Sequence, residues 1–515
     1  AYHYQSRLRT LNLQALAEYQ HTFADKHDLG LMVGYESYES NNEYVEAIGS
    51  NLYNPGQWAV NNTIDQRRGY GASNGYATRG IFGRFKYNFD ERIFFMASYR
   101  RDASSRFHPD HRWGNFWSAS IAWDMKKEAF LREITNIDML KLKFSFGQNG
   151  NDGIGNNYAY LDQYTLTGAD GVFNDATLAY KGNPEITWET SNNLNAGVDF
   201  SFFKGRISGT LEYYQRQVSD MLFNIPVSPS LGYGSIPMNI GSMRNNGVEL
   251  ELNLRPIDLK TIPWDVYANF TAPNNKVIKL APEILNEKGE WINGTRIYRE
   301  GESMYQLYLV KYAGVNAENG EAMYYGGGKH YEINGVPYLT AAGAIPVDDD
   351  GNLLVPSDES AVLVDGEFVT RNWATAYNSN RASTGNIMPK LYGGFGTSIN
   401  AYGFDASVNF AYQCGGRVFD SSYQSYMNAM LASNIGQNVH VDILNAWTPE
   451  NTATDVPRIS TTDQYTNSTS DRFLISSNYL SLSNITVGYT IPEKFTAKAY
   501  LHNVRIYFSG ENVAL

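Results

Sequence analysis

The stretch Val248-Glu249-Leu250-Glu251-Leu252-Asn253-Leu254-Arg255 decides the fold class, because apolar and polar residues alternate along it. Successive side chains of a β-strand point to opposite faces, so this stretch predicts a strand with one apolar and one polar face. The same alternation recurs in Leu194–Phe202 and Phe404–Tyr412. A soluble sandwich buries the apolar face of such a strand. A transmembrane barrel turns that face toward lipid and keeps the polar face in a wet lumen.

Composition bears on which classes of protein this chain can belong to. The chain has 515 residues, of which 14% are aromatic, and its formal net charge is -12. An acidic chain is a poor nucleic-acid binder, because phosphates require a basic surface. Mean hydropathy is -0.41, and no stretch approaches the roughly 18 apolar residues of a spanning helix. A barrel strand needs only about 9–11 residues, half of them apolar, so low hydropathy is compatible with a barrel.

Short and long connections between the expected strands largely alternate along the chain. Short turns are expected at His21–Asp28, Asn88–Arg92, Phe203–Arg206, Pro256–Pro263 and Ala401–Gly403, and Lys126–Met139 has room for one short helix. This alternation of short and long connections is typical of an up-and-down barrel. The connections divide this chain into about fourteen expected strands. Long loops are expected at Glu39–Tyr76, Arg101–Asn115, Gln148–Thr187, Asn224–Asn245, Asn274–Pro389 and Gly415–Asn478.

The sequence therefore predicts an all-β chain, residues 1–515, forming a large antiparallel transmembrane β-barrel domain. Both ends fall inside strand-like runs, and an open sheet edge is untenable in lipid, so we expect a fragment of a longer protein. The faces are predicted as well, with an aromatic girdle at Trp113, Phe116, Trp117, Trp123, Tyr213 and Tyr214. The alternative is that Tyr and Trp occur there because they are good strand formers. Lipid should meet Leu250, Leu252, Leu254, Val408 and Phe410, and the lumen should receive Glu249, Glu251, Asp405 and Asn409.

No motif for catalysis or metal binding has its required context. Gly71-Ala72-Ser73-Asn74-Gly75 matches a nucleophile elbow but is expected in a loop with no helix after it. Asp348-Asp349-Asp350-Gly351-Asn352 has its glycine too early for a calcium loop, and a solvated turn is expected. Carboxylates are plentiful, but none is singled out, and the one cysteine, Cys414, is expected to be a packing residue. We predict no catalytic residue, no metal and no cofactor.

Loop aromatics are the candidates for substrate binding. Aromatic faces beside amides and carboxylates suit sugars or peptides, because they combine apolar contact with directed hydrogen bonds. The alternative for each residue is that it only packs its own loop. The candidate substrate-binding residues are Trp58, Trp373, Tyr377 and Tyr423.

Several ordered motifs resemble the SusC/RagA family of TonB-dependent outer-membrane transporters. The most specific is Arg100-Arg101-Asp102-Ala103-Ser104-Ser105-Arg106-Phe107, where the family pattern has Gly in place of Ala103. Ser481 and Ser483 depart from the family pattern near the C-terminus. The quoted motifs run from about residue 79 onward. They continue with Phe144–Asn151, Asn183–Glu189, Met243–Glu249, Tyr312–Val315, Pro389–Phe395, Trp447–Asn451 and Tyr479–Tyr489.

The resemblance implies part of a 22-stranded barrel, from about the eighth strand to the next-to-last, without the plug, the TonB box or the closing strand. It implies active import of oligosaccharides or oligopeptides across the outer membrane of a Gram-negative bacterium. It also implies two partners: a SusD-like surface lipoprotein at the loops Asn274–Pro389 and Gly415–Asn478, and TonB through the missing N-terminal part. Two alternatives stay open, a passive or structural outer-membrane barrel and a secreted β-rich protein that binds or cleaves glycans.

Overall fold

In the computed structural model, the chain forms two compact units. The first comprises Ala1–Leu285, Phe395–Ser407 and Thr486–Phe508, and the second comprises Asn286–Gly394, Val408–Ile485 and Ser509–Leu515. The structure describes residues 1–169, 172–259, 262–326, 329–333, 336–340, 362–364, 367–428, 436 and 438–514.

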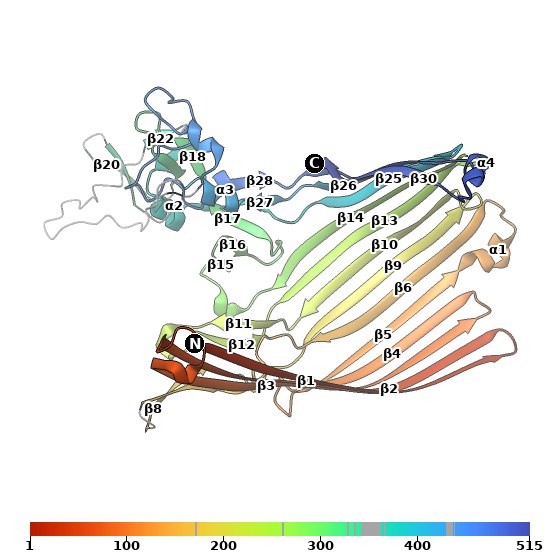
Figure 1. Cartoon of the computed structure of the whole chain (residues 1–515), viewed down its shortest axis with the longest axis horizontal. Helices are drawn as coiled ribbons and strands as arrows, with labels where there is room; N and C mark the ends of the chain where they lie inside the picture. Colours follow the sequence, from red (N-terminus) through yellow and green to blue (C-terminus); the bar gives the residue numbers. More distant parts are fainter. Residues whose placement is uncertain are drawn as a thin grey trace. The chain divides into compact units, whose positions relative to one another are not determined.

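One large sheet dominates the described residues. Fourteen strands within them are hydrogen-bonded in chain order, as predicted (Figure 1). The strands are β1 (Tyr2–Phe23), β2 (His27–Leu52), β3 (Thr63–Phe89), β4 (Ile93–Ser104), β5 (Trp113–Asp124), β6 (Ile137–Asn151), β9 (Glu189–Phe202), β10 (Ile207–Ser219), β13 (Ser242–Leu259), β14 (Ile262–Lys279), β25 (Leu391–Ala401), β26 (Phe404–Cys414), β29 (Tyr479–Thr490) and β30 (Arg505–Ala514).

Connections at one end of these strands are short, and we call this the short-turn end. The turns after β1 and β3 each place two consecutive residues at positive φ, a backbone that matches strand twist: Ala24 and Asp25, then Asp90 and Glu91. The expected short helix lies between β5 and β6. Helices at this end are η2 (Met125–Lys127), α1 (Ala129–Arg132), α4 (Glu493–Thr496) and η8 (Ala497–Ala499).

Connections at the other end, which we call the long-loop end, carry structure of their own. In the first unit they contain η1 (Val60–Asn62), β7 (Gln163–Ala169), β8 (Val172–Tyr180), β11 (Leu222–Pro226), η3 (Pro229–Leu231), β12 (Ser235–Asn239) and η4 (Pro282–Ile284). The predicted loop Gly415–Asn478 fills the interval between β26 and β29.

The second unit consists mainly of small sheets and short helices. The strands are β15 (Trp291–Asn293), β16 (Arg296–Tyr298), β17 (Gln306–Val310), β18 (Tyr312–Val315), β19 (Ala322–Tyr325), β20 (Lys329–Ile333), β21 (Val336–Thr340), β22 (Val362–Val364), β23 (Glu367–Thr370), β24 (Arg381–Asn386), β27 (Arg417–Phe419) and β28 (Leu474–Ser476). The helices are α2 (Trp373–Ser379), α3 (Ser421–Tyr426), η6 (Val441–Asn445) and η7 (Asp471–Phe473). Within the described part of the chain, no helix has the length and apolar character to cross a membrane.

The strand register gathers apolar residues on one face of the first unit's sheet. One row across seven strands is apolar throughout: Ile93, Trp123, Leu142, Val198, Leu211, Leu250 and Phe270. The neighbouring row on the opposite face includes Lys143, Gly197, Glu212, Glu249 and Thr271.

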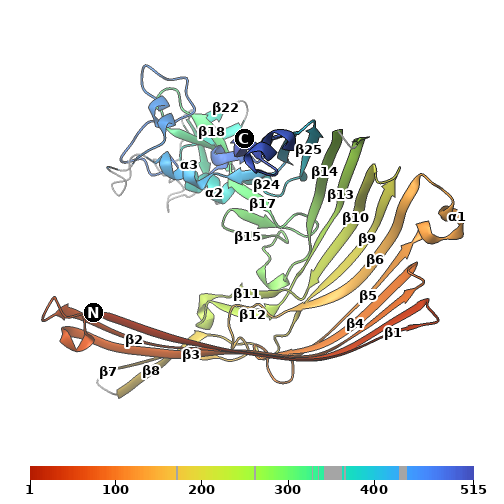
Figure 2. The same ribbon diagram turned by 45° about the vertical axis from the view of Figure 1, so that its right-hand side comes forward.

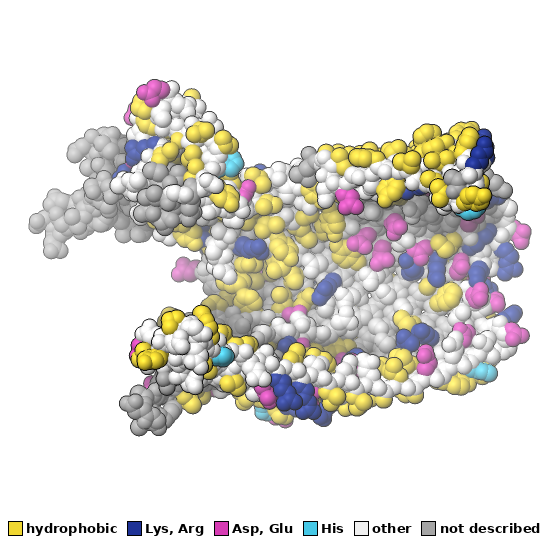
Figure 3. Space-filling model, viewed as in Figure 1, with side chains coloured by type: hydrophobic (Ala, Val, Ile, Leu, Met, Phe, Trp, Pro, Cys, Tyr) yellow, Lys and Arg dark blue, Asp and Glu magenta, His cyan; other side chains and the backbone are white. Residues whose placement is uncertain are grey.

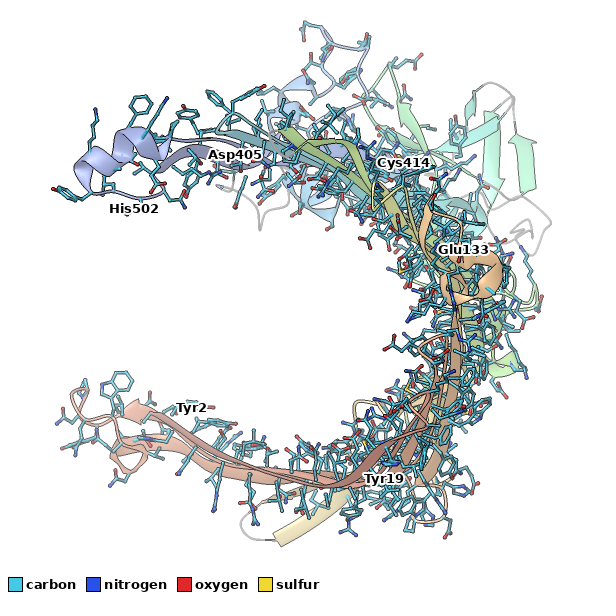
Figure 4. The ribbon with its side chains drawn as sticks, turned by 90° about the vertical axis from the view of Figure 1, so that its right-hand side faces the viewer. Tyr2, Tyr19, Glu133, Asp405, Cys414 and His502 are labelled. Atoms are coloured by element: carbon cyan, nitrogen blue, oxygen red, sulfur yellow. The ribbon has the colours of Figure 1, made fainter. Side chains whose placement is uncertain are left out.

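The two faces therefore separate as the alternation predicts. Leu250, Leu252 and Leu254 are half-exposed rather than packed into a dry core, and so are Val408 and Phe410 in the second unit. Charged side chains are seen in the hollow of the curved sheet over β6 to β13 (Figure 3). Tyr2 and Asp405 lie toward the concave side of the sheet, and Tyr19 lies toward the convex side (Figure 4).

Two expectations are wrong, one about the length of a loop and one about the face on which two aromatic residues lie. Glu39–Tyr76 is not one long loop, because β2 and β3 stay paired from Tyr38↔Thr78 to Ile48↔Arg68 and beyond. Figure 2 shows these strands extending past β4 and β5 at the long-loop end. Phe116 and Tyr214 are not girdle residues. Consecutive residues face opposite sides, so the outer positions of Trp117 and Tyr213 put Phe116 and Tyr214 inside.

Candidate functional site: the inner wall and the loop pockets

The inner face of the sheet contains a broad hollow of about 610 Å³ near the short-turn end, lined by charged, polar and apolar residues. Its floor contains small residues, including Gly30, Ser120 and Gly197. Charged side chains surround the floor, and the Lys143 ammonium lies 2.6 Å from the Asp199 carboxylate. A second hollow of about 510 Å³ shares Asn195 and Glu212 with the first, so the two adjoin. Further charged residues lining them are Glu18, Asp28, Lys86, Arg216 and Glu249.

A third hollow, of about 290 Å³, lies toward the long-loop end of the same face. Arg100 Nε donates to both carboxylate oxygens of Asp102 at 2.7 Å, and Nη2 donates to Glu36 at 2.8 Å. Gly80 makes this cluster possible, because a Cβ there would lie 2.2 Å from Asp102 Oδ1 and 2.8 Å from Arg100 Nη2. Guanidinium groups donate only and carboxylates accept only, so this wall can satisfy hydroxyls and amides of a passing solute.

Residues of two motifs that carry the family resemblance, Arg100–Phe107 and Asn183–Glu189, pack together at the bases of the loops, and we call this packed group the support. Phe107 is fully buried with Ile186, and its ring lies 5.5 Å from that of Trp188. Asp152 Oδ2 accepts hydrogen bonds from Tyr76 at 2.8 Å and from Ser104 at 2.6 Å. Buried hydrogen-bonded networks of this kind rigidify their surroundings.

Arg106 completes this support. Its Nη1 donates to the Asp152 backbone oxygen at 3.1 Å, and its Nε donates to Asn157 at 3.0 Å. The guanidinium also stacks on the Tyr76 ring, 4.3 Å from the centroid. The motif therefore fixes the bases of the loops at 105–112 and 152–188. Sequence reasoning identified the motif without revealing its partner Asp152.

Trp373 and Tyr377 lie together on α2, with ring centroids 4.8 Å apart. Both pack against a buried cluster that includes Val310, Tyr324 and Ala376. Trp373 Nε1 donates to the backbone oxygen of Thr469 at 2.7 Å. These two candidates are half-buried and help to support the second unit, while part of each ring stays accessible.

Tyr423 lies on α3 and packs against a second cluster, formed by Met427, Ala446 and Val456. Its hydroxyl donates to Asp442 Oδ2 at 2.8 Å. Burial, together with the neighbouring Asp442 carboxylate, raises the pKa of Tyr423 to about 12. Trp58 lies in the first unit and is 73% exposed. Trp373 and Tyr377 are in ring contact with each other, whereas the ring of Tyr423 contacts those of His440 and Phe473.

The second unit also contains a polar pocket of about 300 Å³ that sequence reasoning did not find. Glu321 is largely buried there, and its Oε1 accepts hydrogen bonds from Arg371 at 3.2 Å and from Arg458 at 3.1 Å. The pocket also includes Asp463 and Tyr465. The three ion-pair residues are 50 or more positions apart in the chain, so no local pattern reveals them.

The rejected motifs have no catalytic geometry in the described residues. Ser73 lies within β3 and pairs with Glu43, so the stretch around it is a strand rather than a loop or an elbow. The stretch Asp348–Asn352 lies outside the described residues. Among the residues that the structure describes, no group of three or more His, Cys, Asp or Glu side chains could hold a metal ion.

The family follows from comparison with known proteins. The family model described as "TonB dependent receptor-like, beta-barrel" matches residues 1–513. The chain belongs to this family. The match also covers the first 78 residues, where no quoted motif lies, so the family extends further along the chain than the motifs indicate.

Two curated relatives span most of this chain. TonB-dependent receptor P3 of Formosa agariphila is 30% identical over 529 residues, covering 99% of this chain and 48% of the relative. TonB-dependent receptor SusC of Bacteroides thetaiotaomicron is 27% identical over 451 residues, covering 85% and 40%. The chain thus spans about half the length of the curated relatives it matches.

Solved structures agree on the fold. The RagAB peptide transporter matches with a TM-score of 0.77 at 24% identity, covering 100% of this chain and 52% of the matched chain. The 'open-open' state of the RagAB peptide importer matches with a TM-score of 0.75. The predicted all-β fold and the resemblance to SusC/RagA barrels are confirmed.

Proposed function

We propose that this chain forms part of the wall of an outer-membrane transporter that imports oligosaccharides or oligopeptides using energy from TonB. The observation that carries the proposal is the separation of faces. One face of the sheet presents apolar rows to lipid, and the other presents the adjoining hollows, whose linings include charged and amide side chains. Membership of a family of outer-membrane receptor barrels supports it, and so do the names of the relatives, a SusC and a peptide transporter.

The charged side chains of the two adjoining hollows suit a hydrated oligomer in transit. Both lysines and carboxylates line the hollows. The wall therefore offers hydrogen-bond donors and acceptors, and charges of both signs are present on it. A polar solute that leaves water must recover its hydrogen bonds, and such a wall can supply them. We propose transport without chemistry on the substrate, because the described polar clusters are ion pairs and hydrogen-bonded supports.

The long loops are the proposed contact with a SusD-like surface lipoprotein. The segments Asn274–Pro389 and Gly415–Asn478 supply most of the second unit, and long loops in a compact architecture are usually functional. Deleting Tyr331–Thr370, part of which lies outside the described residues, should weaken capture of the lipoprotein while the barrel still inserts. Undiminished capture would contradict this assignment.

Trp58, Trp373, Tyr377 and Tyr423 remain our candidates for contact with substrate. Trp58 is favoured by its exposure, since 73% of it is accessible. The other three combine a structural contact with a partly accessible ring.

Uptake by bacteria tests the function directly. Cells that carry the complete transporter should accumulate labelled oligosaccharide or oligopeptide, and accumulation should stop when TonB is removed or the proton gradient is collapsed. A matched strain with the transporter deleted provides the background. Uptake that continues without TonB would indicate a passive barrel, and absence of any uptake or outer-membrane location would contradict the proposal.

A further inference from the structure

The connection between β5 and β6, residues 125–136, places apolar side chains at the short-turn end of the sheet. It holds η2 and α1, and Phe130 on α1 is 60% exposed. Ile134, just after the helix, is 42% exposed. Single exposed apolar side chains are common on protein surfaces, but those that extend a larger apolar patch mark a site of contact with a membrane or another protein.

Phe130 continues the apolar face of the sheet. Its ring lies 6.3 Å from that of Trp123, in an edge-on contact. Trp123 belongs to the apolar row, with Ile93 and Leu142 as its register partners. Figure 4 shows α1, labelled at Glu133, on the convex side of the sheet. The apolar band therefore extends beyond the strand ends onto this connection.

Several backbone carbonyls of the connection accept hydrogen bonds from side chains within it. The Lys126 ammonium donates to the carbonyls of Leu131, Arg132 and Ile134 at 3.1, 2.9 and 2.8 Å. These are carbonyls that a helix end normally leaves to water. Arg132 Nη2 likewise donates to the Lys127 carbonyl at 3.0 Å. Polar backbone groups can approach hydrocarbon only when such internal partners exist.

The charges beside the aromatic pair are also matched. Glu128 accepts a hydrogen bond from Trp123 Nε1 at 3.1 Å and from Arg92 Nη1 at 3.3 Å. Lys127 pairs with the exposed Glu91 at 2.7 Å. The connection thus has an apolar side beside the sheet's apolar band and a polar side with paired charges. This is the composition of a segment that lies in a membrane interface.

We propose that residues 125–136 form an interfacial anchor, in which Phe130 and Ile134 insert into the lipid leaflet at the short-turn end. The occupant is phospholipid, because the patch is continuous with the face that meets lipid. This inference rests on the proposed membrane function. The anchor would fix the depth of β5 and β6 in the bilayer, while the neighbouring turn with Glu91 stays in water.

Single-cysteine labelling tests the depth of each site. The complete protein is reconstituted in phosphatidylethanolamine–phosphatidylglycerol vesicles, with Cys414 and any other cysteine replaced. A fluorescent label is attached at Phe130→Cys, at Glu91→Cys as the control at the same end, or at Ile121→Cys on the apolar face of β5. Ile121 and Phe130 are both exposed, so these variants should fold. Quenchers are iodide, a lipid with a nitroxide near its headgroup, and a lipid with a nitroxide deep in its chains.

The proposal predicts that the label at 130 loses most of its emission to the shallow lipid quencher and little to iodide. The label at 91 should show the reverse, and the label at 121 should respond most to the deep quencher. Quenching at 130 by iodide alone, or by neither agent, would overturn the anchor, the second result indicating cover by protein. If the label at 121 is also insensitive to both lipid quenchers, the membrane function fails as well.

Discussion

Placing a charge on the apolar face of β13 should destabilise the protein by an amount that the register predicts. Leu252 lies near the middle of the apolar run Val248–Leu254, with Gly209 and Ala268 as its cross-strand partners. Its neighbour Asn253 lies on the opposite, polar face. Leu252→Arg and Asn253→Arg therefore add the same charge one residue apart, one toward lipid and one toward the lumen.

The expected magnitudes differ clearly. An arginine on the lipid face near the bilayer midplane costs about 2–4 kcal/mol, and the cost falls to about 0–1 kcal/mol near the interfaces. The small partners Gly209 and Ala268 give the new guanidinium no carboxylate partner on that face. Asn253→Arg should stay within about 0.5 kcal/mol of the parent protein, since exposed substitutions away from special features rarely do more.

The assay is equilibrium unfolding of the complete protein in lipid vesicles by guanidinium chloride, followed by tryptophan fluorescence. Moving the arginine to Ile257, nearer the strand end, should recover most of the loss, so the costs should follow depth. The reasoning is refuted if Leu252→Arg is neutral, or if Asn253→Arg costs as much as Leu252→Arg. Either result would mean that the apolar face of β13 does not meet lipid.

Four further substitutions test the loop supports and the candidate binding residues. Asp152→Ala removes the common acceptor of three side chains and should cost the adjoining loops about 2–3 kcal/mol, seen as faster proteolysis at residues 152–188 with barrel unfolding unchanged. Tyr423→Phe should cost about 1 kcal/mol through the lost bond to Asp442. Because folding raises the pKa of this tyrosine to about 12, its contribution is present below about pH 10 and is lost as pH rises toward 12, so parent and variant melting temperatures should converge there. Trp58→Ala should weaken substrate binding by about 1–3 kcal/mol in calorimetry without changing stability. Trp373→Ala should also destabilise its unit by about 3 kcal/mol, because that ring packs on a buried cluster.

The strands could be predicted because alternation is a local property. Each run such as Leu250 to Leu254 reveals its two faces without knowledge of its neighbours. Prediction failed in Glu39–Tyr76, although β2 and β3 are paired there. Polar residues such as Asn41 and Asn42 occupy consecutive positions in that stretch, so no apolar face marks the strand. Alternation reports a strand only where its two faces meet different surroundings.

The hollows of the inner wall could not be predicted, because they depend on register. Gly30 and Lys143 line one hollow although they come from β2 and β6, and the strands between them must pair correctly to bring them together. The Arg100 cluster has the same origin, since Glu36 is 64 positions away in the chain. Composition predicts a polar lumen but not where it is hollowed.

The residues that identify the family and the residues that could select a substrate are different parts of this chain. Phe107 and Ile186 are fully buried, and Asp152 is taken up by its three partners. Side chains enclosed in this way cannot touch a solute, so they can set the position of the loops but not the identity of what is bound. On the proposed function, the candidates for selection are accessible groups that these supports hold in place, such as the ring of Trp58 and the charged side chains of the hollows. A change of substrate should therefore be achievable by substitutions at those exposed positions while the buried support is left intact.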